Sequence, residues 1–215
     1  MTGASTVPPR RIVCGELSEN CYVAARGADA VVIDPGGGVE EIARHVAERD
    51  LRIHAVLNTH AHADHLVAAA AIVERYRAPF HLHPADEGLL ARANFYRRVF
   101  HGEGRISVPA LDVSLEGVET LRFGELEVDV LHTPGHTPGS VCFRIGDDVF
   151  TGDTLGAEHV GRTDLPGGDR DALEASIAAI AEACPSAATI WPGHGEPAPA
   201  AEVLEGWARL AELRG

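Results

Sequence analysis

The seven residues from Thr59 to His65 constrain this chain more than any other segment. They read Thr-His-Ala-His-Ala-Asp-His and follow directly on the apolar run 55–57. Three imidazoles and one carboxylate this close together are poorly accommodated in a core without a cation, whereas both groups are good ligands for Zn²⁺ and its first-row neighbours. Extended backbone aims the side chains of His60 and His62 the same way, and Asp64 and His65, at the turn into a predicted helix, can point to a second position.

Three later segments repeat this arrangement of a strand followed by a ligand-type side chain in a turn. They are His132-Thr133-Pro134-Gly135-His136-Thr137-Pro138-Gly139, Gly152-Asp153-Thr154 and Pro192-Gly193-His194-Gly195. Glycine and proline at such sites set unusual backbone angles and let a loop approach a site closely. An isolated His-x-His pair is often a chance surface feature, but the four segments together favour metal binding.

Composition excludes several classes of function. The formal net charge is −14 at pH 7, which argues against a nucleic-acid partner because phosphate binding normally needs a basic surface. All 18 basic residues are arginine, so lysine Schiff bases, a P-loop lysine and a Ser-Lys dyad are excluded. No apolar run approaches the roughly 20 residues that span a bilayer, so no membrane partner is expected. Met1 to Arg11 lacks the apolar core of a signal peptide, and the four cysteines form no CxxC pair. We therefore expect a cytoplasmic protein with buried thiols.

The 215 residues predict one α/β domain, 1–215, with strands and helices interleaved. Strands are predicted at 12–14, 21–23, 30–33, 52–57, 79–83, 121–123, 127–131, 141–145, 148–151 and 189–191. Helices are predicted at 39–49, 65–76 and 170–183, with a last helix ending at Leu213, and 94–109 is predicted to be a loop or a short helical insert. Two strand-rich halves, each closed by helices, indicate sheets packed in the middle with helices outside.

The four segments, in this order and spacing, resemble the metallo-β-lactamase-fold hydrolase superfamily from about Arg11 to Pro197. The resemblance implies an αββα sandwich, in which two central β-sheets are flanked by helices. It implies two divalent first-row metal ions, with zinc expected and iron or manganese as alternatives. The first ion would be held by His60, His62 and His136, the second by Asp64, His65 and His194, and Asp153 would bridge them. Asp64 and Asp153 are then also the candidate catalytic residues, and a metal-bound hydroxide would be the nucleophile.

Within that superfamily the chain is similar to the short bacterial glyoxalase II-like, or hydroxyacylglutathione hydrolase-like, enzymes. The similarity is carried by Asn20-Cys21-Tyr22, Asp34-Pro35-Gly36-Gly37, Gly152-Asp153-Thr154-Leu155 and the segment from Gly161 to Asp169. It implies a binuclear metallo-hydrolase, a thioester hydrolase whose partner is a small-molecule acyl-thiol such as S-lactoylglutathione. The chain departs from the pattern of these enzymes in two ways. Gly156 stands where they usually have a phenylalanine after Gly-Asp-Thr-Leu, and no separate C-terminal glyoxalase II helical domain is expected.

Arg162 aligns with a basic residue that such enzymes use near the glutathione carboxylates, so it is the candidate substrate-binding residue. The alternative is an internal salt bridge with Asp164 or Asp169. The segment 94–98 offers aromatic surface and two guanidinium groups for the substrate pocket, but a solvated loop is favoured for this stretch. The acyl group, the thiol carrier, the metal loaded and a homo-oligomeric state are left open by the sequence.

A different reaction class fits the same residues. The persulfide dioxygenases, mononuclear iron enzymes on the same fold, would use His60, His136 and Asp153 here. The dioxygenases tend to carry Pro-Ala-His-Asp where this chain has Pro192-Gly193-His194-Gly195, which follows the hydrolase form. A non-catalytic metal-binding relative is the third alternative.

Several residues are expected to support the fold rather than bind metal. Asp34 is predicted to form a turn that supports the site, and His132 is predicted to be structural. His81 and His83 are expected in packing or at the surface. The remaining histidines are expected to be exposed or satisfied locally, namely His45, His54, His101 and His159.

Overall fold

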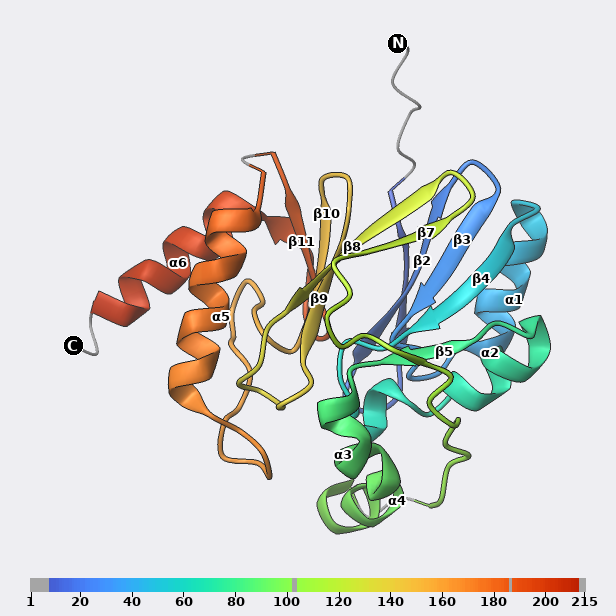
Figure 1. Ribbon diagram of the computed structural model, residues 1–215, viewed down its shortest axis with the longest axis horizontal. Coiled ribbons are helices and arrows are strands. Elements are labelled where there is room, and N and C mark those ends of the chain that lie inside the picture. Colours follow the sequence, from blue (N-terminus) through green and yellow to red (C-terminus); the bar gives the residue numbers. More distant parts are fainter. Residues whose placement is uncertain (1–7, 102–103, 186, 213–215) are drawn as a thin grey trace.

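Two six-stranded β-sheets form the centre of the molecule (Figure 1). The computed structural model describes residues 8–101, 104–185 and 187–212. The first sheet has the order β1-β2-β3-β4-β5-β6 and comprises β1 (Arg10–Cys14), β2 (Glu19–Arg26), β3 (Asp29–Ile33), β4 (Arg52–Leu57), β5 (Phe80–Leu82) and β6 (Val113–Ser114). The second has the order β12-β11-β10-β9-β8-β7 and comprises β7 (Thr120–Phe123), β8 (Leu126–His132), β9 (Val141–Ile145), β10 (Asp148–Gly152), β11 (Thr189–Pro192) and β12 (Ala198–Pro199).

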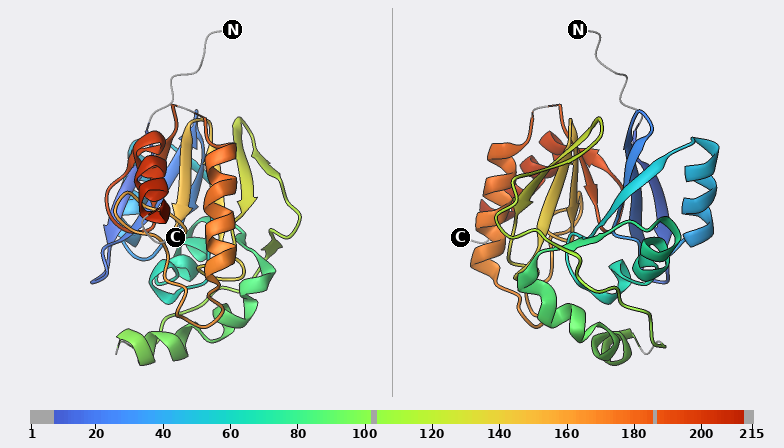
Figure 2. Two further views of the ribbon diagram at one scale, coloured as in Figure 1. Left: turned by 90° about the vertical axis from the view of Figure 1, so that its left-hand side faces the viewer. Right: turned by 45° about the vertical axis from the view of Figure 1, so that its right-hand side comes forward.

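Helices cover the outer face of each sheet (Figures 1 and 2). On the first sheet these are α1 (Val39–Glu48) and α2 (Ala69–Tyr76), and on the second α5 (Arg170–Ala183) and α6 (Ala200–Glu212). Ile42 of α1 and Ile72 of α2 are fully buried in the layer against the first sheet, and Ile177 of α5 in the layer against the second. The predicted α/β sandwich of two central sheets flanked by helices is therefore confirmed.

β3 shows why the sequence folds into these layers. Val31 and Ile33 point into the core between the two sheets, where Phe143 lies, whereas Val32 points to the layer beneath α1 and α2. Because both faces of this strand are buried, its sequence is a continuous apolar run rather than an alternating one. β3 pairs with β4 in parallel, and β4 ends at Leu57, immediately before the histidine cluster. The packed sheets thus hold the start of that cluster rigidly.

The helix predicted at 65–76 begins later than expected. Ala63–His65 forms a single 3₁₀ turn, η1, and α2 starts only at Ala69. The carbonyl of His65 accepts a hydrogen bond from Asn58 Nδ2, and the amide of Ala68 donates to the carbonyl of Pro35. Backbone groups that would continue a helix here are instead bonded to neighbouring segments, which holds this turn against the two sheets.

The region after β5 is more helical than predicted. A 3₁₀ turn, η2 (Pro84–Asp86), leads into two short helices, α3 (Glu87–Ala91) and α4 (Ala93–Tyr96), and a π-helical turn, η3 (Arg97–His101). The structure therefore shows a helical insert rather than a loop at the start of 94–109. α3 and the short strands β6 and β12 were not predicted, and the expected end of the last helix at Leu213 lies outside the described residues.

Two further sequence expectations concern cysteines and membranes. Cys14, Cys21 and Cys142 are buried and Cys184 is half-buried, all as free thiols. Within the described ranges, no helix is both long and apolar enough to cross a bilayer.

Candidate metal centre

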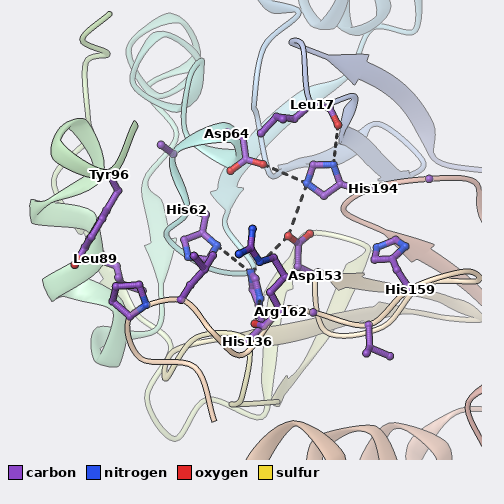
Figure 3. Close-up of a pocket in the computed structure, with 16 residues that line it drawn as sticks. Leu17, His62, Asp64, Leu89, Tyr96, His136, Asp153, His159, Arg162 and His194 are labelled. Atoms are coloured by element: carbon purple, nitrogen blue, oxygen red, sulfur yellow. Dashed lines mark hydrogen bonds and ion pairs between the residues drawn. The ribbon is translucent and has the colours of Figure 1, made fainter. Parts of the chain in front are cut away.

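All seven predicted metal ligands lie at strand ends that meet at one edge of the sandwich. Those from His60 to His65 follow β4, His136 lies in the loop between β8 and β9, Asp153 follows β10 and His194 follows β11. β10 and β11 are parallel neighbours, so their carboxyl ends lie side by side. Figure 3 shows side chains from these separate segments pointing into one cavity.

The first group contains His60, His62, His136 and Asp153. Their potential ligand atoms all lie within 4.8 Å of one another. His136 Nε2 is 2.9 Å from His62 Nδ1 and 3.5 Å from Asp153 Oδ2. His60 Nε2 lies 3.9 Å from the same carboxylate oxygen. Three nitrogens and one oxygen around a common point match the ligand number of a tetrahedral zinc site.

The second group contains Asp64, His65 and His194, whose potential ligand atoms also lie within 4.8 Å of one another. His194 Nε2 is 3.2 Å from Asp64 Oδ2. Asp153 reaches this group as well, because its Oδ1 is 3.4 Å from His65 Nε2 and its Oδ2 is 3.7 Å from His194 Nε2. The Asp153 carboxylate therefore lies between the two groups, where a bridging ligand would have to be.

Hydrogen bonds on the outer side of three imidazoles direct the other ring nitrogen inward. Nδ1 of His136 donates to the carbonyl of Arg162 at 2.8 Å, and Nδ1 of His194 donates to the carbonyl of Leu17 at 3.0 Å. Nδ1 of His60 lies 3.0 Å from Thr59 Oγ1, whose own hydroxyl proton is donated to Asp34. Each bond selects the tautomer that leaves Nε2 with a free lone pair facing the centre.

The donor set fits metal ions, as judged from its unpaired buried atoms. His60 Nε2, both ring nitrogens of His65 and Asp153 Oδ1 are buried without a hydrogen-bond partner among the described residues. A buried polar atom without a partner costs about 1–3 kcal/mol. Three of these atoms, His60 Nε2, His65 Nε2 and Asp153 Oδ1, face the space between the two groups and are stabilised together when cations occupy it.

The protonation states also suit metal binding. Burial lowers the pKa of His60 well below its ordinary value, and burial together with the neighbouring His136 lowers the pKa of His62 to about 4. For Asp153, burial would raise the pKa, but the adjacent His65 outweighs it and holds the pKa well below the usual range. At neutral pH His60 and His62 are thus unprotonated and Asp153 is ionised, which are the forms that bind metals. Burial would lower the pKa of His65 as well, but the carboxylates of Asp153 and Asp64 outweigh it and raise that pKa.

Asp34 supports the site as predicted. It has a positive φ of 47°, and its carboxylate accepts the amide of Thr59 at 2.7 Å and the hydroxyl of Thr59 at 2.6 Å. Its Oδ2 also lies 3.2 Å from His65 Nδ1. Glu19, which sequence reasoning missed, lies 3.7 Å from the same nitrogen and is only 1% exposed. A Cβ at Gly36 would lie 2.1 Å from Glu19 Oε2, so glycine is required for this approach.

The Asn20-Cys21-Tyr22 motif anchors the turn that carries His194. Asn20 Nδ2 donates to the carbonyls of Pro192 and Gly195, and the hydroxyl of Tyr22 donates to the carbonyl of Pro192 at 2.6 Å. The amide of Asn20 donates to the carbonyl of Gly193 at 2.7 Å. A strand near the start of the chain therefore positions a ligand near its end.

Asp86 is a second residue that sequence reasoning missed. It is fully buried, and its carboxylate accepts the amide of Ala61 at 3.0 Å, the hydroxyl of Thr137 at 2.8 Å and the amide of Gly139 at 2.7 Å. These donors belong to the loops that carry His62 and His136, so one carboxylate ties both loops together. Its position directly after a strand, in His83-Pro84-Ala85-Asp86, is the signal that could have identified it.

Arg162 lines the cavity, and one edge of its guanidinium is bonded to Asp164. Nε and Nη2 donate to the two carboxylate oxygens of Asp164 at 2.9 and 2.8 Å. The salt bridge that the sequence left open is therefore formed, with Asp164 and not with Asp169, which instead caps α5 through the amide of Ala172. Arg162 remains the candidate substrate-binding residue by position.

His159 contradicts its sequence expectation. It was expected to be exposed or satisfied locally, whereas it lines the cavity and its Nε2 is buried without a partner among the described residues. Gly156 is the physical reason, because a Cβ there would lie 2.6 Å from His159 Cε1. Figure 3 shows His159 on the same side of the cavity as Asp153 and His194.

The other histidines behave largely as expected. His132 Nε2 lies 2.9 Å from the carbonyl of Pro138, which supports a structural role, and its ring stacks on His83 at 4.1 Å. His81 is buried against Phe123. His54 is satisfied locally by Asp29 at 2.6 Å and His45 is half-buried, whereas the side chain of His101 lies outside the described residues.

Comparison with known proteins places this site in a family context. The model of the metallo-beta-lactamase superfamily matches residues 14–194. The chain is 33% identical to the probable metallo-hydrolase YqgX of Bacillus subtilis, covering 86% of this chain and 89% of that protein. It is 32% identical to the hydroxyacylglutathione hydrolase GloC of Haemophilus influenzae, covering 69% of this chain and 72% of that one.

Three solved structures share the fold at more than 30% identity. The BLEG-1 B3 metallo-beta-lactamase superposes with a TM-score of 0.85 at 31% identity, covering 92% of this chain and 97% of that one. TTHA1623 in a di-iron-bound form superposes with a TM-score of 0.80 at 39% identity, covering 93% of this chain and 97% of that one. ETHE1 from Myxococcus xanthus superposes with a TM-score of 0.71 at 31% identity, covering 88% of this chain and 76% of that one.

Proposed function

Because this chain belongs to the metallo-beta-lactamase superfamily, we propose that it is a binuclear metallo-hydrolase that cleaves the thioester bond of an S-acyl thiol. The observation that carries the proposal is the pair of ligand groups, four and three side chains, that meet around Asp153 at one cavity. Resemblance to a hydroxyacylglutathione hydrolase supports the thioester as substrate. Two divalent ions would supply the chemistry by lowering the pKa of a bound water and polarising the acyl carbonyl.

The chain's own residues would prepare this chemistry. The first ion would be held by His60, His62 and His136, the second by Asp64, His65 and His194, with Asp153 shared between them. Hydrogen bonds to backbone carbonyls hold the rings of His136 and His194 in place, so little reorganisation accompanies binding.

Asp64 is held in its ionised form at the cavity wall. Burial would raise the pKa of Asp64, but the adjacent His65 and His194 outweigh it and lower the pKa to about 2. Asp64 lines the cavity, so an ionised carboxylate faces the space in which the substrate would lie. We assign Asp64 and Asp153 the roles of holding the ions and orienting the attacking water.

The segment from Gly161 to Pro166 supports a substrate in this cavity. Gly161, Arg162, Leu165 and Pro166 line the cavity beside the ligands. A Cβ at Gly161 would lie 2.3 Å from the carbonyl of Asp153 and 2.8 Å from His136 Cβ. The segment thus packs directly on two ligands and brings its remaining side chains to the cavity wall.

A persulfide dioxygenase is the second candidate, favoured by the likeness to ETHE1. That activity would need one iron on His60, His136 and Asp153. It leaves no metal role for Asp64, His65 and His194, although these three side chains converge as closely as the first group. The second group therefore favours the hydrolase.

Metal analysis combined with two assays tests the proposal. Protein purified without oxygen should hold about two first-row metal ions per chain and release thiol from acyl-thiols. His194→Ala should lose one ion and most thioester hydrolysis, whereas His132→Ala, which changes a histidine outside the two groups, should keep both ions. One iron per chain, with oxygen consumed on addition of a persulfide and no thiol released from acyl-thiols, would establish the dioxygenase instead.

A further inference from the structure

The walls of the cavity above the ligands are mainly apolar. The cavity has a volume of about 600 Å³. Apart from the potential metal ligands, its walls include Leu17, Leu89, Tyr96, Val160, Leu165 and Pro166. These side chains come from the β1–β2 turn, from α3 and α4, and from the segment after β10. In Figure 3, Leu89 and Tyr96 lie on the side of His62, and Leu17 lies beside His194.

Cationic groups in the wall are few. Among the described residues that line the cavity, Arg162 is the single arginine, and the chain has no lysine. One bidentate edge of the Arg162 guanidinium, formed by Nε and Nη2, is used by Asp164 in a two-bond ion pair that neutralises its charge. A substrate carboxylate would have to displace Asp164 from this edge or share a guanidinium whose charge Asp164 already neutralises, and either exposed ion pair gains little in water.

The net charge of the chain also disfavours a substrate that carries carboxylates. The formal net charge of −14 repels anionic ligands at long range, although salt screens this repulsion. By contrast, each methylene that an acyl chain buries against apolar side chains increases binding about fourfold, the equivalent of about 0.8 kcal/mol. Away from the ions themselves, the cavity walls therefore favour apolar surface over negative charge.

We propose that this cavity selects acyl-thiols with an apolar acyl group and a thiol carrier that bears no carboxylate. Leu17, Leu89 and Tyr96 contact the apolar group, and Asp164 neutralises the cation that would otherwise bind an acidic carrier. The inference rests on the proposed thioester hydrolysis and narrows its substrate class. Asp164 is then a specificity-determining residue, and the helical insert α3–α4 forms one wall of the acyl site.

Two matched substrate series test the selectivity of the metal-loaded enzyme. One series carries acetyl, butyryl and hexanoyl groups on N-acetylcysteamine, an uncharged thiol, and the other carries the same groups on glutathione. We expect kcat/KM to rise by about fourfold per methylene until the cavity is filled. We also expect the uncharged carrier to exceed glutathione for each acyl group.

The possible failures can be told apart. If protein holding two metal ions hydrolyses neither series, the proposed function is wrong. If it hydrolyses glutathione thioesters better than the uncharged ones, or shows no dependence on chain length, thioester hydrolysis stands and the selectivity proposed here is overturned.

Two pairs of variants locate the effect. Asp164→Asn should lower KM for glutathione thioesters about two- to fivefold and thereby narrow the preference for the uncharged carrier. Glu174→Gln frees Arg170 in the same way outside this cavity and should leave the preference as it is. An unchanged preference in Asp164→Asn would refute the role assigned to Asp164.

Leu17→Asn should flatten the dependence of kcat/KM on chain length, with metal content unchanged. Val13→Asn is the matched control, because Val13 is an exposed aliphatic residue of the neighbouring strand that does not line the cavity (54% exposed, against 47% for Leu17). Equal effects of the two substitutions would contradict contact between Leu17 and the acyl group.

Discussion

Replacing Asp86 by alanine tests whether one buried carboxylate holds the two ligand loops together. Oδ2 accepts the amide of Ala61 and the hydroxyl of Thr137, and Oδ1 accepts the amide of Gly139. The side chain is fully buried, so water does not replace these bonds without disturbing the packing. Asp86→Ala should therefore weaken both the fold and the metal centre.

The size of the effect follows from the donors left behind. The hydroxyl of Thr137 keeps a partner in Ser140 Oγ at 2.7 Å, so two buried backbone amides lose their acceptor. Each unsatisfied amide costs about 1–3 kcal/mol. The free energy of unfolding should thus fall by about 2–6 kcal/mol. Asp86→Asn should reduce the free energy of unfolding by less, because its side-chain oxygen still accepts a hydrogen bond from one of the two backbone amides.

Metal affinity supplies a second readout. His62 is adjacent to Ala61, and His136 is adjacent to Thr137. Loss of a group that orients ligands commonly lowers metal affinity about 10–100-fold. We would measure urea unfolding of metal-free protein and, separately, metal affinity by competition with a chelator.

Asp112→Ala is the matched control for Asp86→Ala. Asp112 accepts the amide of Phe80 at 2.9 Å at the other end of β5 and contacts neither ligand loop. It should reduce stability slightly and leave metal affinity unchanged. The reasoning fails if Asp86→Ala loses less than about 1 kcal/mol of stability, or if Asp112→Ala weakens metal binding equally.

Three further outcomes are expected. Gly193→Ala should abolish activity and lose metal, because its Cβ would lie 2.3 Å from Asp153 Oδ1, whereas Gly206→Ala, with open space around it, should retain metal. Removing metal with a chelator should lower Tm by about 10–20 °C, as expected for two ions each present at about 100 times its Kd, and an unchanged Tm would argue against bound ions. Burial lowers the pKa of His81 below its usual value of 6.5. Just below pH 6.5 the unfolded chain therefore binds a proton at this side chain that the native state does not bind. His81 alone should therefore reduce stability by up to about 1.4 kcal/mol per pH unit below pH 6.5, and His81→Gln should make the slope shallower by that amount in urea unfolding at pH 7.5 and 5.5.

Much of the fold was predictable because its signals are local. The apolar runs that form β3, β4 and β9, and the spacing that forms α1 and α5, were predicted within one or two residues at each end. α2 was predicted to begin too early because the residues just before it are bonded to Asn58 and Pro35, and the partner Pro35 lies more than 30 positions away from Ala68 in the sequence. Short elements such as α3 and β6 carry too few residues for a periodic pattern.

The candidate metal ligands were predictable for a similar reason. Each is a histidine or aspartate that follows an apolar strand in a turn, and that pattern is visible in a few consecutive residues. The structure brings all seven together as the sequence predicted, and adds Asp86, Glu19 and His159. Those three were missed because their importance depends on neighbours 25 or more positions away, or on the missing side chain of Gly156.

The sequence by itself determined which residues can bind metal and that two sheets form between layers of helices, because side-chain chemistry and hydrophobic periodicity are properties of short segments. The tertiary structure alone decided what faces those residues. Leu17, Leu89 and Tyr96 are ordinary residue types with no local signal, and they become one cavity wall only when the β1–β2 turn and α3–α4 pack around the same centre. Likewise, the sequence left open whether Arg162 pairs with Asp164 or with Asp169, and its side-chain geometry in the fold shows the pair with Asp164.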